Sequence, residues 1–387
     1  MNAAIVGIGE LPQGRSAAVS PMALHAALVV RALADAGIAR TDVDCVLTVS
    51  PRADPYLVHA AALAEHLGIQ PAIAWTLEAG GAAPAAMVEV GRGLIAGGRA
   101  HTVLAVAADM PLGSVTRETY IRALADVGPV HPDYERPFAP TVPSMFALVA
   151  RAHMDAFGTT REQLGAVALQ DRRMAATHPN AHHREALTME AYLAAVPIAD
   201  PLALFDCAPV SDGGGAFVMC APDRARDAPN ASVAILGTGF ATGQQHLTAA
   251  DSLVAFGAGR ALDAALRDAK LARDTIDVAL VYDCFTIAML VNLEDLGFAG
   301  KGEGGAAFAA GAFDAGGALT VNPHGGLLSH GHPARAGGIG NLIEAVVQLR
   351  RQAGARQVKD AEVAMVHGMG GVFATHGIVL LGSAGGP

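Results

Sequence analysis

The chain of 387 residues is poor in aromatic and in charged residues, which make up 5% and 16% of it. Its net charge of −10 argues against a nucleic-acid backbone as partner. It contains no run of about 18 uninterrupted apolar residues, so no membrane-spanning helix is expected. The start, Met1–Gly7, has no charged stretch before an apolar one, so no secretory signal is expected either. We therefore expect a cytoplasmic protein that binds neither nucleic acid nor membrane.

Cysteine is scarce as well. The four cysteines show no CxxC spacing and no regular framework, so we expect neither a disulfide scaffold nor a metal site. Glycine, by contrast, is abundant at 45 residues, and 52% of the chain is hydrophobic. Small residues let helices and sheets approach closely, which predicts several packed layers of secondary structure.

Two segments of the chain resemble each other. Ala32–Val49 and Ala265–Tyr282 match at eight of eighteen positions at a constant offset of 233, and each follows an apolar run that contains two glycines. Each copy predicts a strand, an amphipathic helix, a tight turn and a second, buried strand. A chance likeness of two alanine-rich helices is the alternative, but alanine bias does not explain the shared Asp and Arg residues. The repeat predicts an α/β fold with two pseudo-symmetric halves.

The boundary between the halves is expected near residue 230, because Ala221–Asn230 is polar and rich in helix breakers. The N-terminal half would span residues 1–230 and the C-terminal half residues 231–387. Within the first half, residues 111–200 are rich in proline and histidine. We interpret them as a loop excursion from the core, a common place for binding surfaces.

Four segments carry the candidate chemistry, and each has a plainer alternative. A glycine-rich run, Asn322–Pro333, can aim an imidazole into a cleft, or it is a turn with incidental histidines. Tyr282–Thr286 places polar groups after a buried strand, although an isolated cysteine there also fits a small buried position. His367–Gly371 is a close backbone approach to a ligand or a simple turn. Thr76–Pro84 is a strand-to-helix turn suited to an anion or thiolate, yet it holds no cysteine, serine or lysine.

These segments resemble the motifs of the thiolase superfamily. The run NPHGGLLSHGHP is similar to the thiolase signature that ends in Gly-His-Pro, and YDCF is similar to the HDCF motif of sterol-carrier-protein-type thiolases, the counterpart of NEAF. HGMGG resembles the C-terminal glycine-rich loop. Asp206–Gly214 and Leu293–Gly305 resemble bacterial lipid-transfer-type thiolase-like proteins. The resemblance implies a thiolase-like αβαβα layered fold, a homodimer and an acyl-CoA substrate, with coenzyme A as part of the substrate and no other cofactor.

The resemblance also implies roles for individual residues. His332 takes the place of the histidine that activates the thiolase nucleophile, and Tyr282 and Cys284 take the acid/base places of NEAF and HDCF. No cysteine lies near His367, so Cys284 fits the sterol-carrier pattern, in which the HDCF cysteine is used. The position of the family's nucleophilic cysteine is occupied here by Gly81. Glycine has no side chain that could form a thioester, so the covalent acyl-enzyme intermediate of thiolases is lost.

Three hypotheses for function remain. The first is acid/base cleavage of a C–C bond in an acyl-CoA thioester, of the retro-aldol type, which similar steroid-degrading aldolases perform with a small OB-fold partner. Its expected catalytic residues are Tyr282 and His332, with Cys284 and His367 as secondary candidates, and its expected substrate-binding positions are Asn322, Gly81 and Gly370. The second is an acyl-CoA acyltransferase of the acetyl-CoA acetyltransferase kind. The third is a non-catalytic protein that binds acyl-CoA or lipid.

Overall fold

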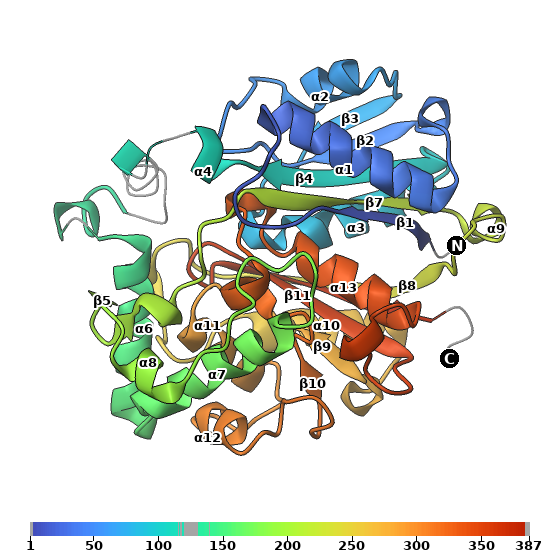
Figure 1. Cartoon of the computed structure of the whole chain (residues 1–387). Coiled ribbons are helices and arrows are strands. Elements are labelled where there is room, and N and C mark those ends of the chain that lie inside the picture. The colour runs from blue at the N-terminus through green and yellow to red at the C-terminus, as the bar shows by residue number, and fades with distance from the viewer. Residues whose placement is uncertain (1–2, 115, 117, 120–130, 139, 384–387) are drawn as a thin grey trace.

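The computed structural model describes residues 3–114, 116, 118–119, 131–138 and 140–383. A ten-stranded sheet runs through them in the order β10-β9-β11-β12-β8-β1-β7-β4-β2-β3 (Figure 1). The strands on one side of the centre are β1 (Ala4–Glu10), β7 (Gly213–Cys220), β4 (Thr102–Asp109), β2 (Cys45–Thr48) and β3 (Ile73–Thr76). On the other side they are β8 (Val233–Thr242), β12 (Thr375–Gly382), β11 (Val363–Gly370), β9 (Val278–Leu280) and β10 (Thr320–Val321).

The sheet has the same topology on both sides of its centre. From β1 outward the neighbouring strands pair antiparallel, antiparallel, parallel and parallel, and from β8 outward they pair in the same sequence of directions. The strands β1 and β8 pair with each other in the middle through a short antiparallel contact. The predicted α/β fold with two pseudo-symmetric halves is therefore confirmed.

Helices lie on both faces and between the halves. The helices α1 (Pro21–Ala36) and α2 (His59–Leu67) cover the outer face of the first half, at the top of Figure 1. The helices α3 (Ala83–Ala96) and α13 (Ile339–Leu349) pack against strands of both halves. The helices α10 (Ala258–Ala269) and α11 (Thr286–Asp295) belong to the core beneath the second half. The order of layers is αβαβα, as expected.

Glycines in the two central strands let the outer helices approach closely. A Cβ atom on Gly7 of β1 would lie 2.3 Å from the carbonyl oxygen of Ala32 in α1. A Cβ atom on Gly237 of β8 would lie 2.6 Å from the carbonyl oxygen of Ala265 in α10. Any side chain there would push the helix off the sheet, so the repeated glycines of the sequence fix the same strand–helix spacing twice.

A repeated aspartate secures the same contact electrostatically. The carboxylate of Asp35 in α1 accepts a hydrogen bond from the N–H of Ile8 at 2.9 Å. The carboxylate of Asp268 in α10 accepts one from the N–H of Thr238 at 3.0 Å. These aspartates are among the eight matched positions of the repeat, so part of the sequence similarity is explained by one structural task performed twice.

The described part of residues 111–200 is more regular than the expected loop. It contains the long helices α6 (Val142–Phe157) and α7 (Arg161–Ala175) and the shorter elements α4 (Pro111–Ser114), α8 (Met189–Leu193) and β5 (Pro197–Ala199), the last paired with β6 (Leu202–Ala203). Residues 115, 117, 120–130 and 139 of this segment lie outside the described part. The apolar faces of α6 and α7 join the core of the second half, where the ring of Phe146 stacks on that of Phe285 at 4.3 Å between centroids. The prolines and histidines had masked this helical periodicity.

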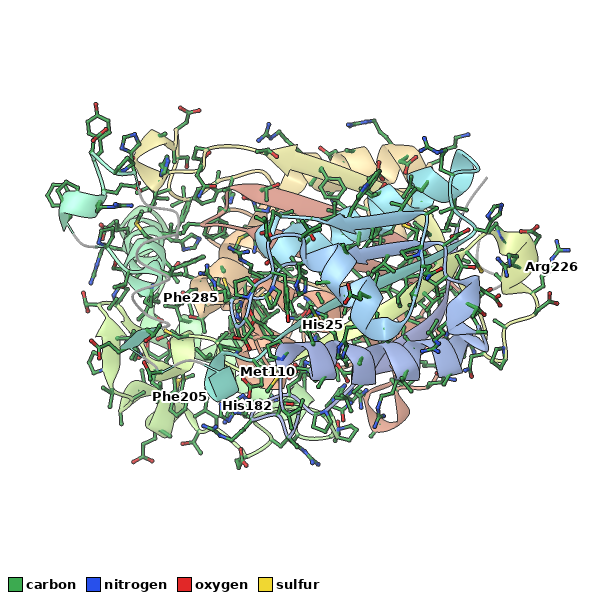
Figure 2. The ribbon with its side chains drawn as sticks, turned by 90° about the horizontal axis from the view of Figure 1, so that it is seen from above. His25, Met110, His182, Phe205, Arg226 and Phe285 are labelled. Carbon is green, nitrogen blue, oxygen red and sulfur yellow. The ribbon has the colours of Figure 1, made fainter. Side chains whose placement is uncertain are left out.

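The breaker-rich segment 221–230 contains the short helix α9 (Pro222–Ala225), and a further short helix, α12 (Gly304–Ala309), follows α11. Seen from above in Figure 2, Arg226 lies at the opposite end of the molecule from Phe205 and Phe285. Among the described residues, none of the helices combines the length and the hydrophobicity that a membrane crossing requires.

Candidate active site

The candidate site begins where β9 ends. Asn322, which follows β10, is fully buried and uses its side-chain amide on the backbone of Val281. Its Oδ1 accepts the N–H of Val281 at 2.7 Å, and its Nδ2 donates to the carbonyl oxygen of Val281 at 2.9 Å. The side chain thus continues the parallel pairing of the two strands by one step. Both ends of the amide are occupied, so Asn322 fixes the direction of the next residue, Tyr282, rather than facing a ligand.

The phenol of Tyr282 meets the imidazole of His332. The Oη of Tyr282 lies 3.0 Å from the Nε2 of His332, and the two rings stand at 77° with centroids 6.0 Å apart. Tyr282 is buried, whereas His332 keeps a partly exposed edge. Burial lowers the pKa of His332 to about 4, and the ring also hydrogen-bonds its own backbone. A neutral His332 of this kind can accept a hydrogen bond from the Tyr282 hydroxyl at Nε2.

Gly81 lies directly against the Tyr282 ring. It sits in a short turn, Gly80–Ala82, that leads into α3. A Cβ atom on Gly81 would lie 2.2 Å from Cε2 and 2.3 Å from Cζ of Tyr282, and 2.5 Å from the carbonyl oxygen of Met369. On another side of the ring, a Cβ atom on Gly337 would lie 3.1 Å from the Tyr282 Oη. The Tyr282 ring therefore occupies the space that a side chain at position 81 would need.

His367 and Gly370 come from β11 and lie behind this centre. The Nδ1 of His367 accepts the N–H of Tyr282 at 3.4 Å, and its Nε2 lies 3.1 Å from the Nδ1 of His376. Burial, and then the neighbouring His376, holds the pKa of His367 well below its usual range. With both ring nitrogens engaged, His367 braces the Tyr282 backbone. Gly370 allows β11 to approach the turn before α3, since a Cβ atom there would lie 2.3 Å from the carbonyl oxygen of Ala79.

Cys284 is placed near Tyr282 but is poorly suited to nucleophilic attack. It is buried, and its burial, followed by the charge of Asp283, raises the pKa of the thiol well above its ordinary value. Thiol reactivity requires the thiolate form. The carbonyl oxygen of Cys284 accepts the N–H of Ala208, which ties this loop to the segment after β6. The geometry supports a small buried residue at this position.

Two buried carboxyl groups under the glycine-rich loop were missed in the sequence. The carboxylate of Asp283 accepts the N–H groups of Leu327 at 2.8 Å and Leu328 at 3.1 Å. Asp171 of α7 faces Asp283, and burial together with the Asp283 charge holds the pKa of Asp171 well above its usual range. A protonated Asp171 can donate to Asp283. An aspartate on the buried face of α7 was the available signal, hidden because the segment was interpreted as a loop.

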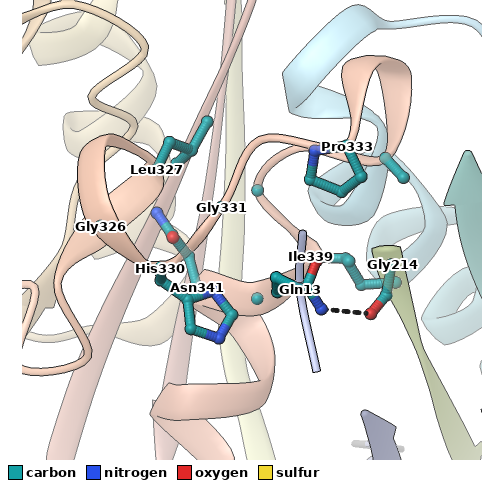
Figure 3. A pocket seen from close by; sticks show the side chains of 12 residues that line it. Gln13, Gly214, Gly326, Leu327, His330, Gly331, Pro333, Ile339 and Asn341 are labelled. Carbon is teal, nitrogen blue, oxygen red and sulfur yellow. Dashed lines mark hydrogen bonds between the residues drawn. The ribbon is translucent and has the colours of Figure 1, made fainter. Parts of the chain in front are cut away.

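The loop that carries His332 is held from a second side by Ser211. The Ser211 Oγ accepts the N–H of His332 at 3.2 Å and lies 2.8 Å from the Nδ1 of His182. A small cavity of about 10 Å³ lies behind the same loop and is bounded in part by Gln13, His330 and Asn341 (Figure 3). It has room for about one water molecule. These contacts fix the loop from behind, and His332 itself is half-buried.

The geometry can be compared with known proteins. Residues 239–383 match the family model described as thiolase C-terminal domain-like. An acetyl-CoA acetyltransferase of Methanothermobacter thermautotrophicus is 33% identical over 381 residues, which cover 96% of this chain and 97% of that protein. A 17-hydroxy-3-oxo-4-pregnene-20-carboxyl-CoA lyase of Mycobacterium tuberculosis is 34% identical over 364 residues, 90% and 91% of the two chains.

A solved structure agrees with these relatives. The structure titled Ltp2-ChsH2(DUF35) aldolase superposes with a TM-score of 0.87 at 29% identity, and the match covers 99% of this chain and 98% of the other. The chain belongs to the thiolase superfamily. The family predicted from the motifs is therefore confirmed, while the roles of the individual site residues stay predictions.

Proposed function

We propose that the protein cleaves a C–C bond of a β-hydroxyacyl-CoA thioester by a retro-aldol reaction that forms no acyl-cysteine. The main support for this proposal is the contact of Gly81 with Tyr282, because the tyrosine ring fills the space that a nucleophilic side chain would need. A lyase, an aldolase and a steroid side-chain-cleaving aldolase among the similar proteins support this direction. CoA belongs to the substrate, and no other cofactor enters the proposal.

The proposed reaction uses the Tyr282–His332 pair as a proton relay. The β-hydroxyl group of the substrate gives its proton to the Tyr282 Oη as the tyrosine proton passes to the His332 Nε2, 3.0 Å away. The hydroxyl oxygen then forms a carbonyl group while the Cα–Cβ bond breaks, and the electron pair moves into the thioester enolate. Protonation of the enolate at Cα gives a shortened acyl-CoA and a free ketone or aldehyde. The positive end of the α3 dipole, beside Gly81, is proposed to stabilise the negative charge of the enolate.

The remaining predicted residues take positioning roles in this proposal. Asn322 holds the backbone of Val281 just before Tyr282, and His367 accepts the Tyr282 N–H. Gly81 leaves room for the Tyr282 ring, and Gly370 lets β11 approach the turn before α3. Cys284 stays protonated and serves packing.

The second candidate is acyl transfer, which the acetyl-CoA acetyltransferase relatives favour. It requires a thiolate near His332. Burial raises the pKa of the thiol of Cys284, and of Cys45, Cys207 and Cys220 as well, which disfavours the thiolate, so the retro-aldol proposal fits the geometry better. Non-catalytic binding of acyl-CoA or lipid, the third hypothesis, leaves the buried Tyr282–His332 pair without a task.

Two partners are part of the proposal. A small OB-fold protein is proposed as a CoA-binding partner, since the similar solved structure is titled as an aldolase of two components, Ltp2 and ChsH2(DUF35). A homodimer is proposed through the edge strand β3, whose Trp75 is exposed and lies near the exposed Leu57 and Val58. The hydrogen bond from the N–H of Ala60 to the Thr76 hydroxyl at 3.1 Å brings these segments together.

The test is a substrate comparison on the purified chain, alone and with the candidate partner. Acetyl-CoA, acetoacetyl-CoA and a β-hydroxyacyl-CoA are offered, and carbonyl release, thiolysis and acyl-enzyme mass are measured. We expect ketone or aldehyde release from the β-hydroxyacyl-CoA only. Thiolysis, or an acetyl group trapped on the protein, would overturn the proposal in favour of acyl transfer. Binding of the CoA esters without any turnover would overturn it in favour of the binding protein.

A further inference from the structure

Behind the glycine-rich loop, three distant segments bring two imidazoles and a carboxylate together. Glu10 ends β1, His178 follows α7, and His330 lies two residues before His332. Their candidate ligand atoms all lie within 4.8 Å of one another. The Nε2 of His330 is 3.1 Å from Oε1 of Glu10, and the Nε2 of His178 is 3.9 Å from Oε2 of Glu10. The side chains of Glu10, His178 and His330 are only 10%, 6% and 4% exposed.

One nitrogen atom of this cluster lacks a hydrogen-bond partner among the described residues. The Nε2 of His330 is buried and makes no hydrogen bond of acceptable geometry within the described residues, although it points at Glu10. The carboxylate of Glu344 pairs with the guanidinium of Arg356 at 3.0 Å, whereas among the described residues the printed partners of Glu10 are His178, His330 and Asn180, with no arginine or lysine. A buried charge needs a partner, and a cation between the histidines and Glu10 would provide it.

The group is also reachable from outside. A cleft of about 500 Å³ opens between β1, α1, α13 and the turn after α7, and Glu10 and His178 are part of its wall. Asn180 lines the same cleft and donates from Nδ2 to the Glu10 Oε2 at 2.7 Å, which fixes the carboxylate in place. Metal-ligating carboxylates are characteristically held by such outer hydrogen bonds.

We propose that Glu10, His178 and His330 bind one divalent transition-metal ion, with zinc as the best match to two imidazoles and a carboxylate. The fourth position faces the cleft and takes water. In the ion-free geometry the backbone N–H of Asn180 donates to the Nδ1 of His178 at 3.1 Å. Because Nδ1 accepts this hydrogen bond, the proton of the neutral His178 ring sits on Nε2. Ion binding moves this proton to Nδ1 and opens the Asn180 contact. The ion would tie together β1, the turn after α7 and the loop that carries His332.

The inference revises the expectation that the chain has no metal site. That expectation rested on cysteine spacing alone, and ligands contributed by three remote segments leave no spacing signal in the sequence. The site does not use Tyr282, and its test is a metal measurement, so its failure and that of the proposed function are separate outcomes.

The test is zinc binding to the full chain after chelator treatment. The protein is dialysed against ZnCl2 and zinc per chain is measured by mass spectrometry, with affinity from competition against a chromogenic chelator. We expect one zinc per chain, and a fall in affinity of at least about 100-fold in Glu10→Gln and in His178→Gln. His66→Gln removes an exposed histidine of α2 and is the matched control, expected to bind like the unchanged chain.

A measurement on the unchanged chain covers the case in which the variants fail to fold. X-ray absorption at the zinc edge is expected to show two imidazoles and light oxygen ligands at about 2.0–2.2 Å. Failure to bind stoichiometric zinc, a sulfur ligand in the absorption spectrum, or unchanged zinc affinity in both folded variants would each overturn the proposal.

Discussion

The two halves of the molecule share one frame, and each half braces the other. Asp35 of the first half pairs with Arg350 of the second at 2.7 Å, and Asp268 of the second half pairs with Arg92 of the first. In both cases the arginine lies in or at the end of a helix of the central layer, α13 or α3. The repeated aspartates thus hold both a strand of their own half and an arginine of the other half.

The halves differ where their strands end. Tyr282 follows β9, whereas the matched position after β2, at the same offset of 233, is the buried Val49. The loop after β2 is closed by Asp109, which accepts the N–H of Arg52 at 2.7 Å and of Ala53 at 3.1 Å. The comparison teaches that residues present in both copies maintain the frame, while the proposed chemistry depends on a residue found in one copy only.

The largest expected effect comes from removing the hydroxyl group of Tyr282, which the matched Val49 of the first half lacks. In Tyr282→Phe the ring still fills the space beside Gly81, but the proton relay to His332 is lost. We expect kcat for carbonyl release to fall by about 10²–10⁴-fold with unchanged thermal stability. Tyr134→Phe removes an exposed hydroxyl and is the control. If Tyr282→Phe keeps its activity within a few-fold, the reaction does not depend on the residue that distinguishes the second half from the first.

Much of this asymmetry could be predicted from the sequence. The repeat gave the two halves, because glycines and aspartates with the same task recur at a nearly constant offset. The motif around Tyr282 was recognised because it follows a buried strand, and His332 was chosen as a catalytic candidate from the family resemblance, but their contact at 3.0 Å was not predicted.

Other parts of the site could not be predicted. The role of Asn322 depends on which backbone group its amide meets, and the engagement of His367 depends on His376 in the next strand. Such contacts are set by packing between segments distant in sequence, and a motif records only residue types. The clash at Gly81 likewise needs the coordinates of the Tyr282 ring, although the absence of a cysteine was visible from the sequence.

The second prediction tests the frame by removing the same charge in each half. Arg350 has a fully buried side chain, while Arg92 and Asp268 are 20% and 37% exposed. Asp35→Asn leaves a buried guanidinium without its carboxylate, so we expect a loss of about 3 kcal/mol in the free energy of unfolding. Asp268→Asn should cost about 1 kcal/mol, because its pair is partly hydrated. Denaturant unfolding measures both, and equal losses would show that burial does not distinguish the two braces.

The third prediction tests the contact between the α3 entry and Tyr282. Gly81→Ala places a methyl group into the tyrosine ring, so we expect a loss of about 2 kcal/mol in the free energy of unfolding and lower activity through displacement of the ring. Gly93 lies within α3, the helix that follows this turn, with nothing within 4 Å of an added Cβ. Gly93→Ala should therefore stabilise by up to about 1 kcal/mol. If Gly81→Ala is stabilised as well as Gly93→Ala, the Tyr282 ring does not fill the space beside position 81, on which the proposed function depends.

The smallest expected effect concerns Asp171, which α7 supplies to the second half and for which the first half has no described counterpart. Burial and the Asp283 charge raise the pKa of Asp171 well above its usual range, and burial raises that of Asp283 to about 6. A raised pKa in the folded state means that the folded protein keeps its proton while the unfolded chain loses it. This contribution to stability is complete below about pH 4, falls as the pH rises through the folded-state pKa values, and does not return above them.

Asp171→Asn removes that pH-dependent loss, because the amide carries N–H donors toward Asp283 at any pH, whereas the acid can donate only when it is protonated. We expect the variant and the unchanged chain to be about equally stable at pH 4.5, and the variant to be more stable by about 1 kcal/mol at pH 8. Urea unfolding across this range measures the difference, with the exposed Asp274→Asn as the control that should show no trend. A variant that is less stable at pH 8 would mean that Asp171 is ionised in the folded protein. Asp171 and Asp283 would then both be charged beneath the loop, instead of being linked by one proton.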